Sequence, residues 1–163
     1  MSAARTGQTG RMRMTRVVAA LVLSAALCAA VGALAGCSVQ TAPRVVLKTA
    51  HTGAGDVVVD ADGRAVYLYA RDSPGAHAGS CAGSCLAAWP PVTTSSAAPE
   101  GEGISARIGE IPAPGGGHQV TLDGWPLYYF DGDTGPGMIK GQGIGGVWWL
   151  LAPDGTRVPA IGR

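Results

Sequence analysis

Short hydrophobic runs of about five residues alternate with glycine- and proline-containing segments along most of the chain. The runs are rich in valine, tyrosine and tryptophan, which favour β-strands. Several of them are bounded by Asp-Gly pairs, at 62–63, 123–124 and 154–155, of the kind that form tight hairpin turns. We therefore expect strands within Val45–Leu47, Val57–Val59, Ala65–Tyr69, His118–Leu122, Trp125–Phe130 and Val147–Leu151.

Helical periodicity is almost absent from the same region. One helical turn is expected around Ser84–Trp89, and the two prolines at Pro90 and Pro91 would end it at once. The hydrophobic pattern thus predicts a mainly β fold with at most one short helical turn.

An internal repeat is the most informative feature of the pattern. A turn, a strand with two aromatic residues two positions apart, an acid and a Pro-Gly pair occur twice, about 61 residues apart. The repeated residues are Tyr67, Tyr69, Asp72 and Pro74 in the first copy, and Tyr128, Phe130, Asp133 and Pro136 in the second. We expect two repeats of antiparallel hairpins, at about 57–92 and 118–155, packed into one small sandwich- or barrel-like domain over 45–163.

The repeated residues have two interpretations. Aromatic residues two apart in a strand face one side of the sheet, where they either fill the core or form an exposed platform for flat ligands. Asp72 and Asp133 are expected to accept backbone N–H bonds in the turn before Pro-Gly. Asp131 and Asp133 also leave a calcium loop as an alternative.

The N-terminal region has the pattern of an export signal. A stretch without charge, residues 17–35, follows a cationic segment and ends in Ala35-Gly36-Cys37, where small side chains precede a thiol. We expect residues 1–36 to be a lipoprotein signal peptide, Cys37 to carry lipid, and residues 37–44 to form a short tether. An uncleaved membrane anchor is the alternative. The basic residues of the cationic segment are Arg5, Arg11, Arg13 and Arg16.

Removal of the signal changes the charge. The whole chain has a formal net charge of +1, but residues 37–163 hold eight basic and eleven acidic side chains, a net charge of −3. No basic patch remains, so we expect no nucleic-acid partner. No nucleophile–base arrangement or phosphate-binding loop is recognisable, so we expect neither an enzyme nor a cofactor.

Two cysteines and a histidine form the remaining candidate site. Cys81 and Cys85 lie four residues apart, and His77 precedes them by four. In an oxidising compartment the cysteines are expected to form a disulfide. The alternatives are a copper or redox site that uses both thiolates and His77, or free thiols.

The repeated motif resembles a family of bacterial lipoproteins and secreted-repeat proteins with a Tyr-x-aromatic-x-x-Asp repeat. The first copy reads Tyr67 to Asp72 and the second reads Tyr128 to Asp133. The likeness extends over residues 57–155, including the Cys81–Cys85 segment and the Gly146-Val147-Trp148-Trp149 stretch. It implies a β fold and an extracytoplasmic location, and it implies no reaction.

These observations predict a membrane-anchored extracytoplasmic lipoprotein of the cell membrane, with its domain on the outer face. We expect a non-enzymatic binding or structural module of the cell envelope, with an envelope protein or a glycan as partner. The alternative is a copper-binding or electron-transfer lipoprotein built on Cys81, Cys85 and His77.

Overall fold

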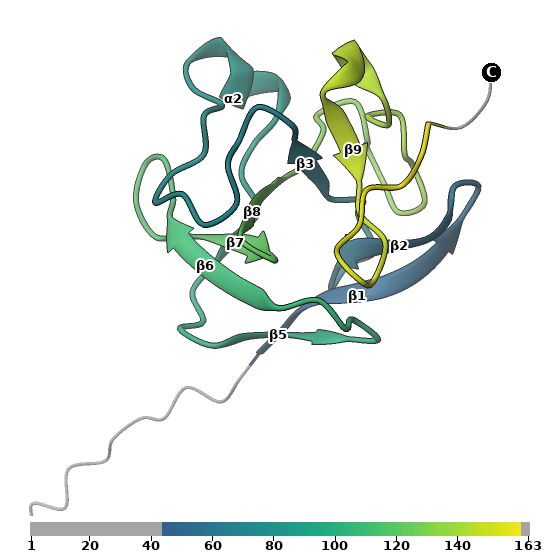
Figure 1. Cartoon of the computed structure of the whole chain (residues 1–163), viewed down its shortest axis with the longest axis horizontal. Helices are drawn as coiled ribbons and strands as arrows, with labels where there is room; N and C mark the ends of the chain where they lie inside the picture. The colour runs from purple at the N-terminus through teal and green to yellow at the C-terminus, as the bar shows by residue number, and fades with distance from the viewer. Residues whose placement is uncertain (1–43, 161–163) are drawn as a thin grey trace, which may run out of the picture. The chain divides into compact units, whose positions relative to one another are not determined.

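The computed structural model describes residues 44–160, which form a mainly β domain of nine strands in two sheets (Figure 1). The first repeat contributes β1 (Arg44–Thr52), β2 (Gly55–Asp60), β3 (Tyr67–Tyr69), α2 (Ser84–Ala88) and β4 (Thr93–Thr94). The second repeat contributes β6 (Ile108–Pro112), β7 (His118–Leu122), β8 (Trp125–Tyr128), the 3-10 turn η1 (Ile144–Gly146) and β9 (Trp148–Leu150), while β5 (Pro99–Glu102) lies in the connector. The predicted signal peptide and Cys37 lie outside the described residues.

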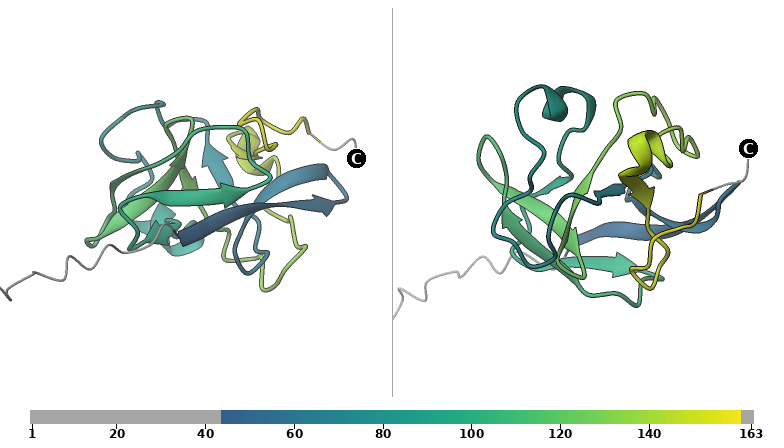
Figure 2. Two further views of the ribbon diagram at one scale, coloured as in Figure 1. Left: turned by 90° about the horizontal axis from the view of Figure 1, so that it is seen from below. Right: turned by 45° about the horizontal axis from the view of Figure 1, so that its top comes forward.

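The strands form a six-stranded and a three-stranded sheet. The larger sheet has the order β4-β7-β8-β3-β9, with β6 on the other side of β7, and the smaller has the order β2-β1-β5. The two sheets meet where the Val58 N–H donates to the Leu151 carbonyl (2.9 Å) and where Val59 pairs with Ala65. Figure 2 shows β1 and β2 running beside the strands of the larger sheet.

Both faces of β2 and β3 are buried. Val57 and Val59 of β2 belong to one hydrophobic cluster together with Tyr67, whereas Val58 belongs to a second cluster together with Leu68. Successive side chains of a strand point to opposite faces. A strand that is covered on both faces therefore appears in the sequence as a continuous hydrophobic run, such as Val57-Val58-Val59.

The central strands of the two repeats pair with each other. In the antiparallel β3–β8 ladder, Tyr67 lies opposite Tyr128 and Leu68 lies opposite Leu127. Equivalent tyrosines are thus direct partners, as a local two-fold relation between the repeats requires. The predicted packing of one repeat on the other is confirmed.

The final strand of each repeat is exchanged between the repeats. β9 of the second repeat pairs with β3 of the first, with Leu150 opposite Tyr67. In the corresponding place Pro91 of the first repeat lies opposite Tyr128, and the Pro90 carbonyl accepts the Tyr129 N–H (2.8 Å). On the other side of Pro91 the Val92 N–H donates to the Leu127 carbonyl (2.9 Å). Because Pro90 has no N–H to return a bond to Tyr129, the pairing is a single bridge and not a ladder. Each repeat therefore needs the other to complete its sheet.

Hairpin turns and the helical segment agree with the sequence pattern. Asp123 (φ 47°) and Gly124 (φ 82°) join β7 to β8 with two left-handed residues, the geometry that favours Asp-Gly. The predicted helical turn is α2. Three strands, β4, β5 and β6, were not predicted. In the part of the chain that the structure describes, no helix has the length and apolar character needed to cross a membrane.

Candidate functional site

The motif tyrosines and acids are hydrogen-bonded across the repeats. The Tyr67 hydroxyl donates to Asp133 Oδ2 (2.5 Å), and the Tyr128 hydroxyl donates to Asp72 Oδ2 (3.0 Å). Each tyrosine thus bonds to the acid of the other copy and not to that of its own. All four side chains are buried, so these two bonds join the repeats in a water-poor interior.

The second carboxylate oxygen of each motif acid binds the loop that follows it. Asp72 Oδ1 accepts hydrogen bonds from the Ser80 backbone N–H and from Ser80 Oγ (both 2.6 Å), and Asp133 Oδ1 accepts the Lys140 N–H (2.9 Å). The acids do accept backbone N–H groups, but from residues beyond the Pro-Gly pair and not within the turn. Since both oxygens of Asp133 already have donors, this carboxylate does not form the open calcium loop that we considered.

The aromatic residues form a continuous stack within the core. Trp89 and Trp148 lie face to face, with ring centroids 3.8 Å apart, and Tyr69 and Phe130 cover the outer faces of this pair at 4.2 Å and 4.5 Å. Tyr67 contacts Trp89 edge-on, and Tyr128 contacts Trp148 edge-on. Trp89 and Trp148 are 5 % exposed, so the rings serve as core and do not form an open platform.

The Pro-Gly pairs pack against the turn of the opposite repeat. The Gly75 N–H that follows Pro74 donates to the Gly124 carbonyl (3.0 Å). Reciprocally, a Cβ at Gly63 would lie 3.3 Å from Cβ of Pro136. The Pro-Gly pair of each repeat therefore contacts the Asp-Gly turn of the other repeat.

Cys81 and Cys85 form a disulfide, which confirms the predicted bond. Trp89 follows at the end of α2, one helical turn after Cys85, and its backbone N–H donates to the Cys85 carbonyl (2.9 Å). His77 is exposed and lines a separate groove of about 280 Å³ beside Arg107 and Glu110. Over residues 44–160, no three His, Cys, Asp or Glu side chains are grouped so that they could hold a metal ion. The disulfide leaves neither sulfur as a thiolate ligand.

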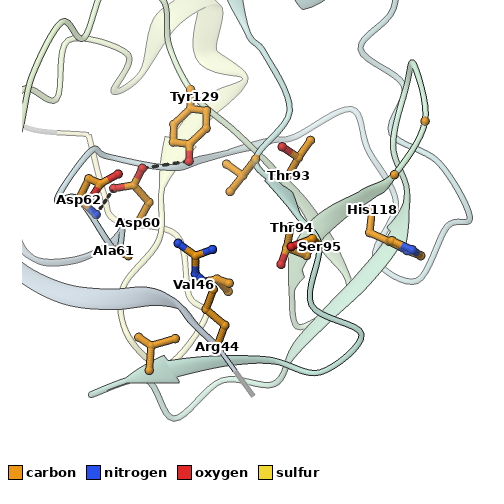
Figure 3. Close-up of a pocket in the computed structure, with 14 residues that line it drawn as sticks. Arg44, Val46, Asp60, Ala61, Asp62, Thr93, Thr94, Ser95, His118 and Tyr129 are labelled. Carbon is orange, nitrogen blue, oxygen red and sulfur yellow. Dashed lines mark hydrogen bonds between the residues drawn. The ribbon is translucent and has the colours of Figure 1, made fainter. Parts of the chain in front are cut away.

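A polar cleft of about 450 Å³ lies beside the start of β1 and the end of β2 (Figure 3). β1 supplies one wall, the end of β2 and its turn supply a second, and the segment through β4 supplies a third. Its lining combines hydroxyl and charged groups with small apolar side chains. The residues with polar side chains are Arg44, Asp60, Asp62, Thr93, Thr94, Ser95, His118 and Tyr129.

Hydrogen bonds hold the inner end of this cleft in one geometry. Asp60 Oδ1 accepts the backbone N–H groups of Asp62 (2.9 Å) and Arg64 (2.8 Å), and Asp60 Oδ2 accepts the Tyr129 hydroxyl (2.9 Å). The Arg64 guanidinium covers the Tyr129 ring at 4.2 Å. Burial raises the pKa of Tyr129 above its usual value, and the nearby Asp60 charge adds to the shift, so this hydroxyl stays protonated.

The corresponding place in the second repeat is closed. There the Arg107 N–H donates to Asp123 Oδ1 and the Asp123 N–H donates to the Arg107 carbonyl (both 2.8 Å). The N–H groups of Ser105 and Ala106 also donate to the Pro153 carbonyl (3.0 and 3.1 Å). In the first repeat, the equivalents of Ser105 and Ala106 are Arg44 and Val45, which pair instead with β5. Pairing with the connector strand therefore turns the start of β1 away and leaves the cleft open.

Polar residues replace apolar ones at the open position. The ladders start at Leu47–Asp60 in the first repeat and at Ile108–Leu122 in the second, so Asp60 is the equivalent of Leu122. Tyr129 follows Tyr128 as Leu68 follows Tyr67, and by the same pairing Thr93 is the equivalent of Ala152. Leu68 and Leu122 are buried in the core. This cleft was not predicted: at a spacing of 61 residues Asp60 aligns with Thr121, and only the ladder register makes it the equivalent of Leu122.

The fold and these contacts define a class: a β domain of two interlocked repeats. The sequence profile of a family described as a secreted repeat of unknown function matches residues 48–93 and 111–152, more than half of the chain. The chain belongs to this secreted-repeat family, which indicates an extracytoplasmic location. No curated protein and no solved structure matched the chain.

Loss of one motif hydroxyl is expected to destabilise the domain. Tyr67→Phe or Tyr128→Phe removes the donor to a buried carboxylate, so each should lower the free energy of unfolding by about 1–3 kcal/mol. Tyr67→Ala also removes a core ring and should cost about 3–5 kcal/mol. Urea unfolding measures these differences, with the half-buried Tyr69→Phe as the control. Wild-type stability in both Phe variants would contradict the proposed importance of the exchanged bonds.

The buried phenols should resist alkaline titration. Burial raises the pKa of Tyr67, Tyr128 and Tyr129 above the ordinary value of 10.0, and Asp133, Asp72 and Asp60, respectively, add to the effect. Because the folded-state pKa values exceed the unfolded ones, the stabilisation is complete below pH 10 and is lost as the pH rises above it. In an ultraviolet titration, three of the four tyrosines should ionise only together with loss of the near-ultraviolet circular dichroism. Ionisation of all four near pH 10 in folded protein would be the opposite result.

Proposed function

We propose that this protein is a lipid-anchored, non-enzymatic binding module on the outer face of the cytoplasmic membrane, and that the polar cleft is its binding site. Membership of the secreted-repeat family supports the extracytoplasmic location. The sequence at Ala35-Gly36-Cys37, after a cationic and an uncharged segment, supports lipidation of Cys37. Acyl chains on this residue would hold the domain firmly, at roughly 0.8 kcal/mol for each buried methylene.

A short tether would keep the cleft close to the membrane. Arg44 lines the cleft and lies only seven residues after Cys37. At about 3.3–3.6 Å for each extended residue, the tether reaches on the order of 25 Å. A partner of this site would therefore be a component of the envelope near the membrane surface.

The observation that carries the binding role is the difference between the two repeats. In the second repeat, backbone hydrogen bonds and leucine side chains close the site that corresponds to the cleft. The fold therefore does not require a cleft in the first repeat. At the open position Asp60 and Tyr129 replace two buried leucines and bond to each other. Burial of polar groups in place of leucine is unfavourable unless they are satisfied. Asp60 and Tyr129 are hydrogen-bonded to each other and line a cleft, an arrangement that is better explained by ligand binding than by stability.

The geometry favours binding over catalysis. Three protein donors already engage the Asp60 carboxylate, which orients Tyr129 and the turn. Neighbouring Thr94 is fixed in a similar way, because its Oγ1 accepts the Ser96 N–H (3.0 Å). Groups held in this manner form a preorganised surface, which lowers the entropic cost of binding.

Replacement of the lipidated cysteine tests the anchor. In Cys37→Ala the thiol that accepts the lipid is missing, so metabolic labelling with a fatty acid should yield no labelled protein. Wild-type protein should carry label and begin at residue 37 by mass spectrometry. Unchanged labelling of the variant, or residues upstream of 37 on the native product, would rule out the assigned anchor.

Sedimentation with washed, detergent-extracted cell envelopes tests the binding site. The full chain in detergent should co-sediment with this material, and Asp60→Leu/Tyr129→Leu should reduce the bound fraction at least about tenfold, since it installs the residues of the closed repeat. Thr134→Val, an exposed change in the second repeat, serves as the matched control. Melting curves establish that the double variant is folded. Equal sedimentation of folded double variant and wild type would remove the cleft from the binding site.

A further inference from the structure

The chemistry of the cleft also limits what it can bind, provided that the proposed function holds and the cleft is the binding site. Three kinds of group face the opening: the hydroxyls of Thr93, Thr94 and Ser95, the carboxylates of Asp60 and Asp62, and the guanidinium of Arg44 (Figure 3). Between these polar groups the lining is apolar, with Val45, Val46, Ala61 and Val92. An acyl chain or another largely hydrophobic ligand would leave these polar groups without partners.

The distribution of charge disfavours strongly charged ligands. One cation, Arg44, lies on the β1 wall, and the two carboxylates of Asp60 and Asp62 lie on the wall beside it. A phosphate would approach both carboxylates with a single arginine to bind it, whereas phosphate sites usually combine several cationic or N–H donors. A polycation would meet Arg44. The cleft therefore suits a ligand without net charge that both donates and accepts hydrogen bonds.

A polyhydroxylated ring satisfies this requirement. Sugar hydroxyls donate to carboxylates and accept from guanidinium and hydroxyl groups, and the fixed fork of an arginine can bind two neighbouring oxygens. The Tyr129 oxygen, which donates its proton to Asp60 Oδ2, still has lone pairs that can accept a ligand hydroxyl. A volume of about 450 Å³ is within the usual range of small-molecule sites.

A peptide is the other neutral polar ligand to consider. An extended peptide would bind by addition to a free strand edge. Two strands border the cleft with more than one residue each. β4 pairs through both of its residues with β7, and β1 reaches the cleft only at residues 44–46, where Arg44 and Val45 pair with β5. Edges of two and three residues are too short for a ladder of main-chain bonds. The side-chain hydroxyls that border the cleft favour a sugar instead.

We infer that the cleft is a carbohydrate-binding site that takes one or two neutral sugar rings of an envelope glycan through hydrogen bonds to their hydroxyls. Asp60 and Tyr129 form its rigid inner end. Thr93, Asp62 and Arg44 supply the contacts that select the sugar. Anionic and phosphorylated glycans bind less well than the corresponding neutral ones.

A glycan array probed with the full chain in detergent tests this inference. Neutral saccharides should be retained, and their affinity should change less than about twofold between 0.05 and 0.5 M salt, because no ion pair is broken. For the best saccharide, calorimetry should show that Thr93→Val and Tyr129→Phe each weaken binding by about 3–10-fold, as expected for loss of one hydrogen bond. Asp60→Leu/Tyr129→Leu should abolish binding, and Thr134→Val should leave it unchanged.

Three results would overturn the carbohydrate assignment. These are preferential, salt-sensitive retention of phosphorylated or anionic glycans, retention that the folded double variant does not reduce, and retention of no glycan at all. If envelope sedimentation still depends on the cleft in any of these cases, only the ligand class is wrong. If the sedimentation is also independent of the cleft, the proposed function fails as well.

Discussion

The exchanged hydrogen bonds between Tyr67 and Asp133 and between Tyr128 and Asp72 couple the two halves of this domain. Each bond satisfies a buried hydroxyl and a buried carboxylate at once, and each carboxylate uses its other oxygen to hold a loop of its own repeat. Separation of the repeats would leave four polar groups without partners, in addition to two unfinished sheets. Strand exchange, aromatic stacking and loop position therefore depend on the same contact.

The two loops that follow the motif deliver a tryptophan to the stack by different means. In the first repeat a disulfide and α2 precede Trp89, whereas in the second a glycine-rich segment and η1 precede Trp148. Gly141 allows close packing in the second loop, because a Cβ there would lie 2.7 Å from the Tyr67 ring. Trp89 and Trp148 thus occupy equivalent positions in the stack, although the loops that precede them differ. The core thus constrains the position of the rings far more than the route of the chain.

Much of the fold follows from local patterns, whereas the contacts between repeats do not. Valine-rich runs and Asp-Gly turns locate β2, β7 and β8, because strand propensity and turn geometry are local properties. The connector strand β5, Pro99–Glu102, contains no residue that favours a strand, and it forms only because it pairs with β1. The spacing of 61 residues between the two copies identified a tyrosine and an acid in each copy from the sequence alone. It did not reveal that each tyrosine bonds to the acid of the other copy, since that depends on the β3–β8 register.

The cleft escaped prediction for a related reason, and its position indicates how sites arise in duplicated domains. Asp60 and Tyr129 belong to no recognisable motif; what distinguishes them is departure from the other copy, where Leu122 and Leu68 stand in their place. Positions that keep their character in both copies build the shared core, so a substitution there disturbs both repeats. Where only one copy has changed, and the new polar groups are hydrogen-bonded to each other, the change has been accommodated without loss of the fold. Comparison between the halves of one chain therefore separates residues that stabilise the domain from those free to acquire a ligand.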